Sequence, residues 1–81
     1  MMTYAQLFTG YETASSEATQ TKVLEKIVAK IDHQMDLKFT SEHILQEMVN
    51  AKFPRLIARD IIKAVEFDRA KRTNMGRLLY G

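Results

Sequence analysis

The sequence predicts one small domain of three helices followed by a C-terminal β-hairpin, and three observations support this mainly α fold class. Apolar residues repeat at helical spacing from Leu24 to Ile31. Pro54 separates two further helical stretches. After Lys63 the apolar residues follow the two-residue period of strands. The alternative is a small all-α bundle, in which the last helix continues to Arg72 and the remainder is a tail.

The composition is that of an ordinary globular domain. The chain has 81 residues, 46% of them hydrophobic, which is enough for one core. It has no cysteine, so neither disulfides nor thiolate ligands are available, and a reducing compartment is permitted. It shows neither a basic start followed by an apolar run nor a stretch of about 20 apolar residues. We therefore expect a soluble, cytoplasmic protein that does not contact a membrane.

Positive charge is concentrated in the last third of the chain. Residues 1–20 carry two acidic residues and no basic one, and residues 21–50 carry four basic and five acidic residues. Residues 51–81 carry eight basic and three acidic residues, a net charge of +5. Such an asymmetry is typical of a surface that meets phosphates. The alternative is that the basic residues only solvate a helix face.

Residues 1–18 are predicted to form an N-terminal arm or a short helix. One face of that helix would present four apolar or aromatic residues at positions i, i+3, i+4 and i+7: Tyr4, Leu7, Phe8 and Tyr11. Gly10 weakens the helical pattern. Two interpretations stay open. The stripe covers the chain's own core, or it packs on a second subunit and makes a homodimer.

Residues 19–81 are predicted to form the main domain. Its first helix carries the apolar stripe Leu24, Ile27, Val28 and Ile31. A short extended piece ending at Phe39 precedes the second helix, which Thr40 or Ser41 caps with a hydroxyl that accepts from a free backbone N–H. The buried side of this second helix is predicted to consist of Ile44, Leu45, Met48 and Val49.

The third helix begins at Pro54 and carries a row of cations. Its predicted buried residues are Ile57, Ile61, Ile62 and Val65. Arg55, Arg59 and Lys63 follow one another at four-residue spacing along an outward row, while Asp60 and Glu66 lie off it. Like charges at this spacing repel by a few tenths of a kcal/mol per pair. An anionic partner would offset that repulsion.

The last segment is predicted to be a basic hairpin over residues 68–80. Val65 and Phe67 alternate on one side, and Leu78 and Tyr80 on the other. The loop between them contains residues that accept the backbone angles of a turn, Asn74 and Gly76. Its basic residues are Arg69, Lys71, Arg72 and Arg77.

Three stretches, FTSEHILQEMV, PRLIARDIIKAVEF and KRTNMGRLLYG, resemble the second helix, the recognition helix and the wing of a winged helix-turn-helix domain. The resemblance covers about residues 22–81, and the ending RTNMGRLLYG is similar to wings of some viral and phage replication proteins. It implies binding of double-stranded DNA, with helix 54–66 in the major groove and the hairpin on the backbone or in the minor groove. It further implies a small regulator of transcription or replication, in the nucleoid or, if phage-encoded, in the host cytoplasm.

The resemblance also assigns roles to individual residues. Arg55 and Arg59 would read bases, since arginine donating to guanine is the commonest specific contact. Lys63 would face the same groove. Phosphate contacts would come from the wing and from the start of the second helix, through Lys71, Arg72, Asn74, Arg77, Thr40 and Ser41.

Residues for catalysis are few. The only histidines are His33 and His43, and the cluster Asp32, His33 and Asp36 lacks a metal-site spacing, so we interpret it as a solvated helix end. We expect no enzyme activity, no metal and no cofactor.

Two other functions remain as alternatives. The first is a protein–protein interaction module or inhibitor that uses the basic surface to bind an acidic surface, for example on a host nucleic-acid-processing protein. The second is an amphipathic membrane-surface element. It is disfavoured, because the apolar side of the third helix has the rows of a packed core.

Overall fold

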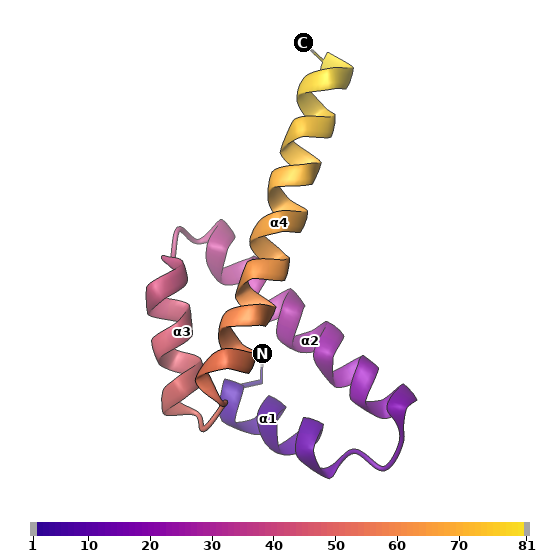
Figure 1. Cartoon of the computed structure of the whole chain (residues 1–81), viewed down its shortest axis with the longest axis vertical. Helices are drawn as coiled ribbons and strands as arrows, with labels where there is room; N and C mark the ends of the chain where they lie inside the picture. Colours follow the sequence, from indigo (N-terminus) through magenta and orange to yellow (C-terminus); the bar gives the residue numbers. More distant parts are fainter. Residues whose placement is uncertain (1, 81) are drawn as a thin grey trace.

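The computed structural model describes residues 2–80, with side chains as far as Thr73. Within these residues the chain forms four helices and no strand: α1 (Tyr4–Thr13), α2 (Glu17–Asp36), α3 (Ser41–Asn50) and α4 (Arg55–Tyr80). Figure 1 shows α1, α2 and α3 gathered around the first half of α4, while the second half of α4 projects beyond them.

The predicted hairpin over residues 68–80 is wrong, because α4 continues through this segment. The predicted winged-helix fold class is therefore wrong as well. In a strand, Val65 and Phe67 would face the same side, whereas in a helix they point about 160° apart. The structure buries Val65, which is 3% exposed, and leaves Phe67 74% exposed. The small all-α bundle fits the observed architecture.

Side-chain caps explain where three of the helices begin. Thr3 and Gln6 form a reciprocal capping box at the start of α1, so part of the predicted arm is a regular helix. Ser16 accepts from the backbone of Thr19 at the start of α2, and Thr40 does the same for α3. Thr40 is therefore the cap, and Ser41 is the first helical residue.

Two lysines in the left-handed backbone region end α2 and α3. Lys38 has φ 71° and Lys52 has φ 81°, values that favour glycine. At the end of α3 the Phe53 N–H donates to the Met48 carbonyl at 3.0 Å, and both side chains are buried. This is the Schellman arrangement, in which a hydrophobic contact accompanies the hydrogen bond that ends the helix.

The link between α2 and α3 is mostly a turn. The sequence predicted an extended piece ending at Phe39, but α2 continues to Asp36 and residues 37–38 turn the chain. Because this link is short, α3 begins immediately beside the end of α2.

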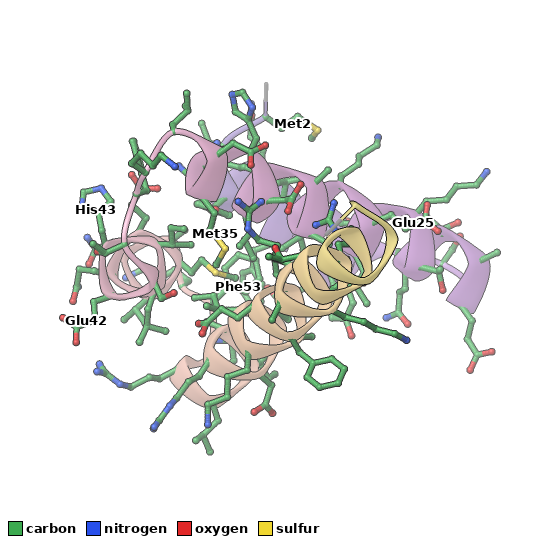
Figure 2. All side chains as sticks on the ribbon, turned by 90° about the horizontal axis from the view of Figure 1, so that it is seen from above. Met2, Glu25, Met35, Glu42, His43 and Phe53 are labelled. Atoms are coloured by element: carbon green, nitrogen blue, oxygen red, sulfur yellow. The ribbon has the colours of Figure 1, made fainter. Side chains whose placement is uncertain are left out.

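The core lies where all four helices meet. Its buried apolar residues are Tyr4, Leu7, Ile27, Ile31, Ile44, Met48, Phe53, Ala58, Ile62 and Val65. Figure 2 shows Met35 and Phe53 pointing into the space between the helices. The predicted burial of Ile57 is wrong, since it is 47% exposed, and Leu24 and Val28 are more than one third exposed. Some predicted core positions therefore lie on the surface of α2 and α4.

A chain of side-chain hydrogen bonds crosses the core. The Tyr4 hydroxyl donates to Gln34 Oε1, and Gln34 Nε2 donates to Glu47 Oε2 at 3.0 Å. These bonds join α1, α2 and α3, and they satisfy Gln34, which is only 9% exposed.

Candidate nucleic-acid interface

A polar groove of about 790 Å³ runs between α3 and the first half of α4. It is lined by Thr40, Ser41, Glu42, His43, Leu45, Gln46, Arg55, Arg59, Ile62, Lys63 and Glu66. We call it the α3–α4 groove. It brings together five of the residues that the sequence predicted for DNA contact: Arg55, Arg59, Lys63, Thr40 and Ser41.

The helical spacing of α4 explains the position of the cations. Ala58 and Ile62 are buried against the other helices, and Arg55, Arg59 and Lys63 follow a neighbouring row toward α3. All three cations are exposed. Within residues 2–73 none of them has an ion-pair partner within 4.0 Å. The row is thus available to an external anion.

Two carboxylates share the groove with the three cations. Glu42 comes from α3, and Glu66 comes from α4, where its Oε1 accepts from the Ser41 hydroxyl at 2.9 Å. Figure 2 shows Glu42 and His43 on the outer side of α3. The groove therefore has an excess of one positive charge when histidine is neutral, less than the sequence row by itself indicated.

The hydroxyls of Thr40 and Ser41 already have partners in the chain. Thr40 Oγ1 accepts from the His43 N–H at 3.1 Å, and Ser41 Oγ donates to Glu66. Both contacts hold the start of α3 in place. Their evident role is structural, and the predicted phosphate contact stays a prediction.

The residues that were predicted to form the wing lie on α4 and not in the loop of a hairpin. Arg72 lies on α4, with Nη2 3.0 Å from Asp32 Oδ1 and Nε 3.2 Å from Asp68 Oδ2. Lys71 is exposed on the same helix. Asn74 and Arg77 lie in α4, and their side chains fall outside the described residues. The prediction that these residues share one loop is therefore wrong, because they follow one another along a helix.

The N-terminal stripe packs mostly on the chain itself. Tyr4 is 4% exposed and Leu7 is 2% exposed. The ring centroids of Phe8 and Phe53 are 4.7 Å apart, and Tyr11 is half-buried. The interpretation as a homodimer contact stays a prediction.

Sequence reasoning missed an ion-pair cluster between α2 and α4. Arg69 Nη1 lies 2.7 Å from Asp32 Oδ1 and 2.9 Å from Asp36 Oδ1. Hydrogen bonds from Arg69, and then from Arg72, hold the pKa of Asp32 below its ordinary value. Hydrogen bonds to Asp32, and then to Asp36, raise the pKa of Arg69. The sequence signal for this cluster was the i, i+4 pair Asp32 and Asp36, which places two carboxylates on one face of a helix. It predicts an ion-pair cluster only if the basic segment that contains Arg69 and Arg72 is also helical.

Metal ligands and membrane spans are two further features that a helical chain can carry. Its His, Asp and Glu residues form no group of three able to hold a metal ion. None of its helices is long and apolar enough to span a membrane. Comparison with family models, curated proteins and solved structures finds no match to this chain.

Proposed function

We propose that the chain is a non-catalytic DNA-binding protein that contacts duplex DNA through the first half of α4, in a regulatory role in transcription or replication. The observation that carries this proposal is the exposed row of Arg55, Arg59 and Lys63 beside α3. A short turn joins α3 to α4, as in helix-turn-helix proteins. In that motif the first residues of the second helix reach the base edges.

The dimensions of the row suit the major groove. A helix with its side chains is about 10–12 Å across, and the major groove of B-DNA, about 12 Å wide, admits one; Arg55 and Lys63, eight residues apart, would then span about 12 Å along it. Arg55 and Arg59 would donate to guanine O6 and N7, and Lys63 would contact a phosphate. With Arg72 engaged by aspartates, three cations carry the contact.

The charge predicts how binding depends on salt. Three contacts correspond to a slope of log K against log salt of about −2.7, since each neutralised phosphate contributes about −0.9. A single copy would therefore bind weakly at physiological salt.

The test is fluorescence anisotropy with random-sequence duplex DNA over a salt series. The variant Arg55→Ala/Arg59→Ala should reduce the slope by about 1.8 and weaken binding. The control Lys22→Ala/Lys26→Ala removes the same charge from exposed positions of α2 and should change the slope little. Equal losses in both variants, or no binding of the original protein at low salt, would overturn the proposal.

A protein partner is the second candidate, and one observation favours it. Leu56 is 73% exposed beside the cationic row, and Glu42 and Glu66 make the groove mixed in charge. An apolar centre surrounded by a polar rim is typical of a protein interface. If DNA binding is absent, the matching experiment is a pull-down in which Leu56→Ala and the arginine double variant both reduce capture of the same protein.

A further inference from the structure

An exposed seam runs along α4 on the side away from the core. It consists of Ile57, Asp60, Ala64, Phe67 and Lys71, all of them exposed. Successive members are separated by three, four, three and four residues, the spacing of the contact positions in a coiled coil. Ala58, Ile62 and Val65, which pack on the other helices, lie on the opposite side of α4. We call the five residues the outer seam.

The apolar members of the outer seam are unusually exposed. Phe67 is 74% exposed and Ile57 is 47% exposed. Val28 of α2 lies beside Ala64, on the wall of a shallow depression between α2 and α4, and is 37% exposed. Ala64 of the seam and Val28 therefore line the same depression, whose walls also include Glu25, Asp32, Asp68 and Arg72. The large apolar side chains that the seam itself exposes are Ile57 and Phe67, and an interface would bury them.

We propose that the outer seam binds the outer seam of a second copy of this chain, with the two α4 helices antiparallel. The charges of the seam point to this occupant. In one antiparallel register, Asp60 of each copy lies opposite Lys71 of the other, and Ala64 lies opposite Phe67. Both pairings belong to the same register because Asp60 precedes Ala64 by four residues, as Phe67 precedes Lys71. Within residues 2–73 neither Asp60 nor Lys71 has an ion-pair partner in its own chain.

The alternative orientation is unfavourable. In a parallel pair of α4 helices, Asp60 would face Asp60 and Lys71 would face Lys71, and like charges at facing positions repel. The antiparallel pair is isologous, because each contact occurs twice about a two-fold axis. It also places the large Phe67 ring against a small alanine, which lets the helices approach closely.

The arrangement has a consequence for the cations. The two-fold axis of an antiparallel pair lies perpendicular to the plane of the two helices, so equivalent rows of both copies face the same way. The rows of Arg55, Arg59 and Lys63 would thus lie on one face of the dimer. The dimer itself does not depend on DNA binding.

Sedimentation equilibrium over roughly micromolar to millimolar protein, without DNA, tests the proposal. We expect a monomer–dimer equilibrium, with a dissociation constant that rises about tenfold or more in Phe67→Ala. The control Leu37→Ala removes an apolar side chain that is 57% exposed at the end of α2, away from the seam, and should leave the constant unchanged. Circular dichroism checks that both variants keep their helices.

Charge reversal tests the register. Asp60→Lys and Lys71→Asp should each weaken the dimer, because each creates two like-charge pairs, and the double variant should restore it. Arg55→Ala/Arg59→Ala should dimerise like the original protein, so failure of DNA binding and failure of dimerisation are separate results. A monomer at every concentration, a dimer unaffected by Phe67→Ala, or no recovery in the double variant would overturn the proposal.

Discussion

Arg69 of α4 and Asp32 of α2 form the closest ion pair of the described chain, with 2.7 Å between Nη1 and Oδ1. Asp36 and Arg72 extend this pair into a cluster. Its two aspartates lie more than 30 residues before its two arginines, so it connects the end of α2 to the part of α4 that leaves the helical body (Figure 1). The cluster explains why α4 can continue past the core.

Replacing Asp32 with asparagine should loosen this connection. Asp32→Asn removes the charge that Arg69 and Arg72 share, so we expect a lower melting temperature at pH 7 and faster amide hydrogen exchange in residues 66–73. Glu12→Gln removes one carboxylate from an exposed position of α1 and serves as the control. Equal exchange in Asp32→Asn and the original protein would contradict the structural role of the cluster.

The same substitution should alter the pH dependence of stability. Because the folded pKa of Asp32 is lowered, the stabilisation is present above its unfolded pKa of about 3.9 and is lost as pH falls through the folded value. The difference in melting temperature between Asp32→Asn and the original protein should therefore shrink on acidification. A difference that stays constant from pH 7 to the acid range would argue against a charged Asp32.

Tyr4→Phe should destabilise the core through its hydrogen bonds. The change leaves Gln34 Oε1 without its donor in a buried position, which costs about 1–3 kcal/mol of unfolding free energy. Denaturant unfolding measures it. Tyr11→Phe, at a half-buried position, should cost less.

Alkaline pH gives a second test of Tyr4. Burial, together with the negative charge of Glu47, raises the pKa of Tyr4 above its ordinary value. The stabilisation is present below the unfolded pKa of about 10 and is lost as pH rises through the folded value. Stability should thus decline above pH of about 10, and less so in Tyr4→Phe. An identical alkaline decline in the two proteins would exclude Tyr4 as its source.

Ile44→Ala should create a cavity where the helices meet. Ile44 is 0% exposed, and truncation of such an isoleucine costs about 2–5 kcal/mol, a large part of the stability of a small domain. The matched change Leu56→Ala, at a residue 73% exposed, should cost less than about 0.5 kcal/mol. Urea unfolding of both variants compares them, and similar losses would contradict the core described above.

Lys52→Gly should stabilise the protein. At φ 81° a lysine pays a steric cost that glycine avoids, partly offset by the greater freedom of glycine in the unfolded chain. We expect a net gain of up to about 1 kcal/mol in unfolding free energy. Lys22→Gly, inside α2, should instead lose about 1 kcal/mol. A loss in both variants would show that the left-handed turn is not formed in solution.

Local sequence signals were sufficient for much of the fold. The stripe that contains Ile27 and Ile31, the cap at Thr40 or Ser41 and the break at Pro54 depend on neighbouring residues only, and the structure confirms a helix boundary or buried face at each. The row of Arg55, Arg59 and Lys63 was visible for the same reason, since helical spacing by itself places it on one face.

The amino-acid sequence by itself therefore determined the first three predicted helices, their separation and the cationic row, because spacing, capping and proline act within a few residues. Only the tertiary structure decided that residues 66–80 continue the helix instead of forming a hairpin. A two-residue period over so few positions is weak, and aspartates more than 30 residues away bind Arg69 and Arg72 and favour a helix. The tertiary structure likewise decided that Phe67 is exposed and that Glu66 shares the α3–α4 groove, since both depend on how the helices pack.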